Sequence, residues 1–147
     1  NISDEDMLLA QAAAILLFSG LSETFENFEN RSAEIARSIL PEFGFDERQT
    51  ERIFNLILAT KEPFQPQNNL EAVLIDARME FIGRVDYLTQ VKLLYLEMKN
   101  RMKDLSKEKF IRKQKALIKE FDFFTVAAQR LREIKAEDQI RKLESWK

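Results

Sequence analysis

Apolar residues recur at intervals of three and four along most of the chain, a spacing typical of amphipathic helices. Gly and Pro number three each, so few positions interrupt this pattern. The pattern predicts helices over about residues 3–18, 25–40, 46–60, 70–82, 86–103, 106–120 and 122–146. We therefore expect an all-α fold, a compact bundle of about seven helices.

Three of the predicted helices begin at residues that favour a helix N-terminus. Ser3 precedes Asp6 by three residues and Asp46 precedes Gln49 by three, which is the spacing of a capping box. Ser106 is the expected cap of the sixth helix. The first helix is apolar almost all round, so we expect it at the centre of the fold. Its longest apolar run, residues 12–18, is shorter than the roughly 20 residues that a membrane-spanning helix needs.

Length and charge fit one soluble domain over residues 1–147. The chain has 23 Lys and Arg against 25 Asp and Glu, a formal net charge of -2. This balance gives no overall positive field, so the sequence predicts neither a nucleic-acid nor a membrane partner. No secretory signal is visible.

Histidine and cysteine are both absent from the chain. Any catalysis or metal binding would therefore have to proceed without imidazole or thiolate. The lack of cysteine also means that no disulfide stabilises the fold, which fits a reducing compartment and predicts a cytoplasmic location.

The segment LIDARMEFIGR, residues 74–84, contains the acid that most resembles a functional carboxylate. Asp76 lies in apolar surroundings, and Glu80, one helical turn later, would share its face. Two acids with added backbone oxygens could hold Mg²⁺ or Ca²⁺. The alternative that we favour is a buried carboxylate paired with an arginine.

Lys61, Arg78 and Arg84 are candidate anion-binding residues, because guanidinium groups bind phosphate in a bidentate manner. The ligand would be a nucleotide or another anionic small molecule. The more common alternative is that Arg78 pairs with Glu80, Asp76 or another nearby acid. A carboxylate pair, Glu26 and Glu29 on one helical face, is a weaker candidate for glycoside chemistry.

Two further stretches have less specific interpretations. Residues 99–115 are locally basic but interrupted by acids, which favours a solvated face of two helices over a binding surface. The last helix carries Leu131, Ile134 and Ile140 on one side, and an exposed Trp146 near its end would favour a homodimer or a partner domain. The twelve phenylalanines mostly predict a filled core.

Several segments together resemble the HD-domain metal-dependent phosphohydrolase superfamily, in its branch of small predicted phosphohydrolases. The resemblance covers nearly the whole chain, and its histidines are substituted. It is carried by FENFENRSAEIARSILPEFGF, RIFNLILAT, LIDARMEFIGR and FDFFTVAAQRLREIK.

The resemblance implies that most metal ligands of the family are missing from this chain. Ser19 and Gly20 stand where the family has its His-Asp doublet. Phe28 stands in place of the histidine of ENHE, and Phe121 in place of a later histidine. Asp76-Ala77-Arg78 replaces DAD, so Asp76 is the remaining ligand position. A first helix of the family would lie upstream of Asn1. Phe28 and Phe121 would make the former pocket apolar.

From this resemblance we expect a catalytically degenerate HD-domain protein, a pseudoenzyme with no cofactor. It would act as a regulatory, ligand-binding or interaction module, as part of a longer signalling or nucleotide-related protein. The alternative is a working phosphohydrolase that uses Mn, Mg or Fe to cleave a nucleotide or other phosphoester, because metal-bound water is the nucleophile in such enzymes. Removal of the histidines by design would give the same sequence pattern.

Overall fold

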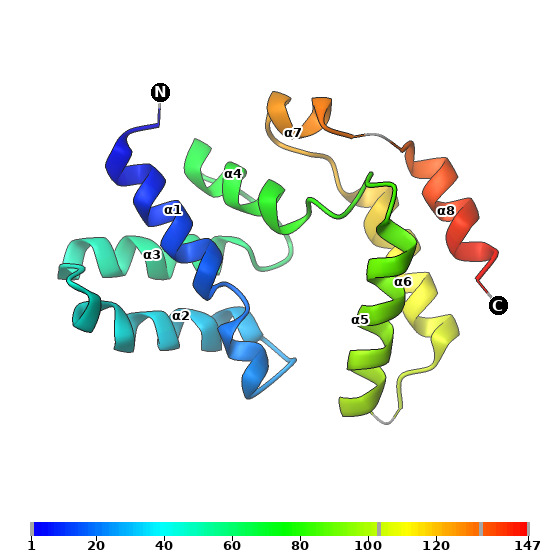
Figure 1. The fold of residues 1–147 in the computed structure, drawn as a ribbon, viewed down its shortest axis with the longest axis horizontal. Coiled ribbons are helices and arrows are strands. Elements are labelled where there is room, and N and C mark those ends of the chain that lie inside the picture. The colour runs from blue at the N-terminus through cyan, green and yellow to red at the C-terminus, as the bar shows by residue number, and fades with distance from the viewer. Residues whose placement is uncertain (1, 103, 133, 147) are drawn as a thin grey trace. The chain divides into compact units, whose positions relative to one another are not determined.

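The computed structural model describes residues 2–102, 104–132 and 134–146, and these form helices with no strand among them (Figure 1). The predicted all-α fold class is therefore confirmed. The chain divides into two compact units, Asn1–Arg78 and Met79–Lys147. The expectation of one HD-domain-like domain over residues 1–147 stays a prediction.

The first unit is built from four α-helices and two short 3₁₀ helices. They are α1 (Asp4–Leu16), η1 (Ser19–Ser22), α2 (Phe28–Ile39), η2 (Leu40–Phe43), α3 (Glu47–Ala59) and α4 (Asn69–Arg78). Helix α1 packs against α2, α3 and α4, and α3 also packs against α2 and α4. The side chains of the core between them are Leu9, Ala13, Leu17, Ala33, Ala36, Leu40, Ile53, Leu56, Ile57, Leu70 and Leu74.

Helix α1 has two apolar faces, and only one of them is buried in the first unit. The predicted capping box is present, because the Ser3 side chain accepts from the Asp6 N–H and the Asp6 side chain accepts from the Ser3 N–H. Leu9 and Ala13 are fully buried, whereas Ile15 is 81% exposed. This helix was expected at the centre of the fold; within the first unit one side of it packs on α2, α3 and α4, and its other side is exposed.

By length and apolar composition alone, Asp4–Ser22 is the one segment of the described residues that could cross a membrane. This observation is weak, because the core helix of a soluble protein passes the same test. The sequence-based expectation against a membrane-spanning helix was drawn from residues 12–18 alone, which are only part of this segment.

Helices α2 and α4 are shorter than the sequence pattern predicts. Asn27 has a φ of 52°, a left-handed conformation that an α-helix cannot include, so α2 begins at Phe28 and not at 25. Helix α4 ends at Arg78 and does not reach Ile82. Helix α3 carries the predicted capping box between Asp46 and Gln49.

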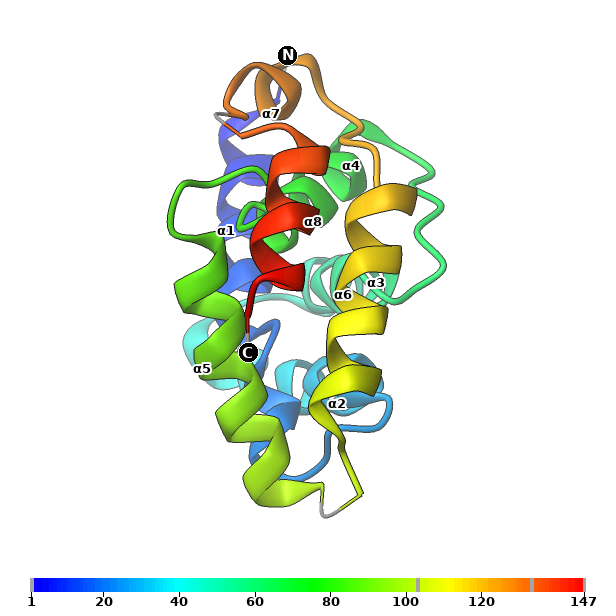
Figure 2. The ribbon, with the colours of Figure 1, turned by 90° about the vertical axis from the view of Figure 1, so that its right-hand side faces the viewer.

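The second unit contains α5 (Tyr87–Arg101), α6 (Lys107–Glu120), α7 (Val126–Arg130) and α8 (Ala136–Glu144). Helices α5 and α6 both pack against α8, as Figure 2 shows. Ser106 caps α6 as predicted, by accepting from the Lys109 N–H. The single last helix that was predicted is two helices, because Thr125 caps a short α7 that ends before α8 begins. The apolar core of this unit includes Tyr87, Val91, Tyr95, Phe110, Ile118 and Leu143.

The aromatic residues divide between the core and the surface. Trp146 lies edge-on to Tyr95 and to Phe110, with ring centroids 5.5 and 6.4 Å apart. It is half-buried and belongs to the core of its own unit, so the expectation of an exposed tryptophan is wrong. Phe43, in contrast, is 73% exposed.

Candidate functional site

A buried ion pair joins α2 to α4 in the first unit. Glu29, in the first turn of α2, accepts from Arg78, in the last turn of α4, with 2.8 Å between Oε1 and Nη2. The carboxylate also lies where an acid is favoured, because the first turn of a helix presents unpaired N–H groups. Glu26 precedes α2 and is exposed, so the predicted pairing of Glu26 with Glu29 on one helical face is wrong.

Arg78 makes contacts beyond the carboxylate of Glu29. Its Nη1 donates to the backbone oxygen of Thr60, the C-cap of α3, and lies 3.3 Å from the Thr60 hydroxyl oxygen. The guanidinium carbon lies 5.1 Å from the ring centroid of Phe28 and 5.8 Å from that of Phe64, which is within the range of cation–π attraction. Arg78 thus connects the start of α2, the end of α3 and the end of α4.

Lys61 lies at the same corner of the first unit. Its ammonium donates to the side-chain oxygen of Asn30 at 3.2 Å. Asn30 follows Glu29 in the chain and Lys61 follows Thr60, so this contact and the Arg78 contacts join the same two segments. The structure therefore brings two of the three predicted anion-binding residues, Lys61 and Arg78, to one place.

Arg84, the third predicted anion-binding residue, belongs to the second unit. It pairs with Glu80 and with Asp86, at 2.8 Å between Nε and the Asp86 Oδ1. Hydrogen bonds to Asp86 and Glu80 raise the pKa of Arg84, and the hydrogen bond from Arg84 lowers the pKa of Asp86. Two carboxylates thus compensate the charge of this guanidinium.

Asp76 is buried on α4, with 4% of the residue exposed. Because α4 ends at Arg78, Glu80 is not on the same helix as Asp76, and the predicted shared face is wrong. Glu80 pairs instead with Arg84. Within residues 2–102, 104–132 and 134–146, no three acidic side chains form a group that could hold a metal ion.

Ser19 and Gly20, which the resemblance would place at the His-Asp doublet, lie in η1. The Ser19 hydroxyl donates to the Leu16 carbonyl oxygen, and the Gly20 N–H donates to the Ser32 hydroxyl oxygen, each at 2.8 Å. A Cβ on Gly20 would lie 2.7 Å from the Ser32 backbone nitrogen and still closer to the Phe28 carbonyl oxygen. No side chain therefore fits at position 20 unless η1 moves away from α2.

Phe28 and Phe121 each pack within their own unit. The Phe28 ring stacks on Phe18 with centroids 5.7 Å apart, on the side of α2 that also meets Arg78. Phe121 is 8% exposed and lies edge-on to Phe123 and Phe124, with centroids 4.9 and 6.2 Å apart. The proposal that both rings fill one former pocket stays a prediction.

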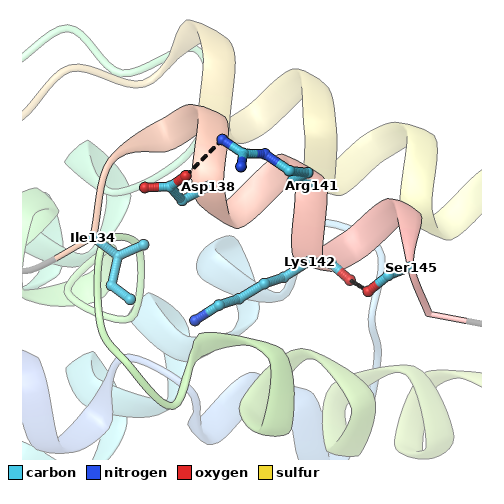
Figure 3. Close-up of a pocket in the computed structure, with 5 residues that line it drawn as sticks. All are labelled: Ile134, Asp138, Arg141, Lys142 and Ser145. Atoms are coloured by element: carbon cyan, nitrogen blue, oxygen red, sulfur yellow. Dashed lines mark hydrogen bonds and ion pairs between the residues drawn. The ribbon is translucent and has the colours of Figure 1, made fainter.

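A shallow hollow beside α8, which the sequence did not indicate, lies in the second unit (Figure 3). Its cavity volume is about 470 Å³, and its lining includes Ile134, Asp138, Arg141, Lys142 and Ser145. Asp138 and Arg141 pair with each other at 2.8 Å at its edge. Asp138, Arg141 and Lys142 of α8 and its C-cap Ser145 have the spacing of one helical face, but no sequence signal indicates the hollow itself.

No protein-family model, curated protein or solved structure matches this chain. The resemblance to the HD-domain superfamily therefore rests on the sequence motifs alone.

Proposed function

We propose that the chain is a catalytically degenerate HD-domain protein that acts as a regulatory, ligand-binding or interaction module. The observation that carries this proposal is the contact between Arg78 and Phe28. By the resemblance, Phe28 replaces a metal-binding histidine and Arg78 replaces the second acid of DAD. A substituted ligand position, Phe28, thus lies against a guanidinium that is two residues after Asp76, the ligand position that remains.

The electrostatics of this corner oppose a divalent cation. A metal site needs several converging donors without protons, and arginine supplies none because it stays protonated. The Glu29 carboxylate beside the guanidinium is already paired with it. At η1, the close approach to α2 leaves no space for a carboxylate at position 20. These features support loss of metal-dependent phosphohydrolase activity.

The decisive experiment measures metal content and phosphatase turnover of the purified protein. Elemental mass spectrometry without added chelator is expected to find no stoichiometric Mn, Fe, Ni or Mg. Turnover of p-nitrophenyl phosphate is expected to be the same for the parent, for Asp76→Asn and for the control Glu34→Gln, which changes an exposed acid. The working phosphohydrolase would be established instead if the parent and Glu34→Gln both contain stoichiometric metal and turn over the substrate, whereas Asp76→Asn has lost the metal and the turnover.

A ligand of this module would meet Lys61 more readily than Arg78 or Arg84. The two arginines are paired with carboxylates, whereas the described contact of the Lys61 ammonium is with a neutral amide. Calorimetric titration with nucleotides tests this part of the proposal. Lys61→Gln is expected to weaken any binding, and Arg31→Gln, which changes an exposed arginine of the same unit, is expected to leave it unchanged.

A further inference from the structure

The small net charge of the chain conceals a large difference between its two units. Residues 1–78 contain 6 Lys and Arg against 14 Asp and Glu, a formal charge of -8. Residues 79–147 contain 17 Lys and Arg against 11 Asp and Glu, a formal charge of +6. At physiological salt, charges act mainly within about 8 Å, so a partner at the surface of the second unit meets its local charge.

The cations of the first unit are all engaged by its own side chains. Its five arginines pair with carboxylates and Lys61 donates to Asn30; the arginine pairs are Arg31–Glu23, Arg37–Glu51, Arg48–Glu5, Arg52–Asp6 and Arg78–Glu29. Among the described residues, Lys and Arg side chains that contact no other side chain of the protein therefore lie in the second unit.

One face of α6 concentrates such charges. Lys109, Arg112, Lys113 and Lys119 are exposed, and they surround the exposed Ala116 along about three helical turns, or roughly 15 Å. Within the described parts of the chain, the side chains of these four residues form no ion pair or hydrogen bond with the protein. We call these four residues the α6 basic face. The opposite side of α6 buries Phe110, Gln114 and Ile118.

The composition of this face limits the chemistry of its partner. The side chain that these four residues surround is the small Ala116, so the face offers no large anchor for the apolar centre of a protein interface and none for insertion among lipid chains. It also has no aromatic ring on which an unpaired base could stack. The phosphate backbone of a duplex needs neither an apolar anchor nor an aromatic ring. Lys and Arg side chains neutralise its phosphates, and the counterions that are then released supply the free energy of sequence-independent binding.

We propose that the α6 basic face binds the phosphate backbone of duplex nucleic acid without reading its sequence. Glu108 and Glu120 lie at the two ends of α6 and repel further phosphates, so the contact is limited to the turns between them. The sequence-based expectation of no nucleic-acid partner rested on the net charge of the whole chain. This inference is independent of the proposed function, since neither the metal content nor Lys61 enters it.

The test is fluorescence anisotropy with a labelled DNA duplex of mixed sequence, titrated with the full chain at several salt concentrations. With four phosphates neutralised, log Kobs is expected to fall with log salt at a slope of about -3.6. Binding at 200 mM salt should then be about 10²-fold weaker than at 50 mM. The double variant K109Q/K113Q should halve this slope and weaken binding at 50 mM salt.

The matched control is R31Q/R48Q, which removes the same two charges from the first unit. It is expected to bind the duplex like the parent, and far-UV circular dichroism of both double variants checks that the helices remain. The proposal is overturned by the absence of binding at 50 mM salt, or by a K109Q/K113Q variant that binds as tightly as the parent. Binding to phosphatidylserine vesicles without binding to duplex also overturns it.

Discussion

The Arg78 Nη2 and Glu29 Oε1 atoms lie 2.8 Å apart, and the two side chains are only 12% and 8% exposed. A buried pair of this kind gains from mutual attraction but loses the hydration of both charges, so its net contribution to stability is small. Replacing only one of the two residues is expected to destabilise the fold strongly, because the other charge then stays buried without a partner. The pair therefore fixes how α2 meets α4 more than it stabilises the first unit.

Glu29→Gln is expected to lower the free energy of unfolding by about 3–5 kcal/mol, because it leaves the Arg78 guanidinium buried and uncompensated. The measurement is urea denaturation followed by far-UV circular dichroism. The fluorescence of Trp146, which is the only tryptophan, reports on the second unit and is unsuitable here.

Two controls separate charge burial from the mere loss of a contact. The double variant E29L/R78M replaces both charges by apolar groups and is expected to cost much less than Glu29→Gln alone. Glu23→Gln breaks the exposed pair with Arg31 and is expected to cost less than about 1 kcal/mol. Equal costs for Glu29→Gln and Glu23→Gln would contradict the burial of the Arg78 pair.

Gly20→Ala is expected to destabilise the first unit by about 1–3 kcal/mol, because the added methyl group meets the backbone of α2. The measurement is again urea denaturation by circular dichroism. Ser22→Ala, on the exposed end of the same 3₁₀ helix, is the control and should stay within about 0.5 kcal/mol of the parent. A Gly20→Ala variant as stable as this control would show that η1 does not touch α2 in solution.

Phe110→Ala is expected to cost the second unit about 3–5 kcal/mol, since Phe110 is almost fully buried beside Trp146 and Tyr95. The loss of packing should also admit water to Trp146 and shift its fluorescence emission to longer wavelength. Phe43→Ala changes an exposed ring of the first unit and should leave the emission unchanged. An unshifted emission in Phe110→Ala would contradict the aromatic cluster.

Local signals in the sequence predicted three helix starts well, whereas the start of α2 and the end of α4 were mispredicted. The Ser3 and Asp46 capping boxes and the Ser106 cap depend on residues three apart, so a short stretch of sequence contains all the information they need. The left-handed conformation of Asn27 and the end of α4 at Arg78 depend on how the chain packs, and apolar periodicity does not report on that packing.

Contacts between residues far apart in sequence were the main source of error. The sequence placed possible acids for Arg78 nearby, at Asp76 and Glu80, whereas the structure pairs it with Glu29 on another helix. Trp146 was expected at the surface because it lies near the end of the chain, yet its ring packs against those of Tyr95 and Phe110. Lys61 and Arg78 lie at one corner of the first unit, whereas Arg84, the third candidate, belongs to the second unit, and anion binding by all three stays a prediction.

The N-terminus of α1 supplies a pH-dependent contribution to stability. The Arg52 side chain lies 2.5 Å from Asp6 Oδ1, and this hydrogen bond, with one from Ser3, lowers the pKa of Asp6 below its ordinary value of 3.8. Hydrogen bonds from Gln49 and Arg48 likewise lower the pKa of Glu5. In the acidic range the unfolded chain therefore binds more protons than the folded chain at these two carboxyl groups.

It follows that this contribution is fully present above the unfolded pKa values and is lost as the pH falls through the lower, folded values. Arg52→Gln should remove part of it, so that stability depends less steeply on pH in the acidic range than in the parent. The measurement is the urea midpoint by circular dichroism between neutral pH and about pH 3. Arg112→Gln is the matched control, because the Arg112 side chain forms no ion pair among the described residues, and its pH dependence should equal that of the parent. Parallel curves for Arg52→Gln and the parent would show that the Asp6 contact does not form in solution.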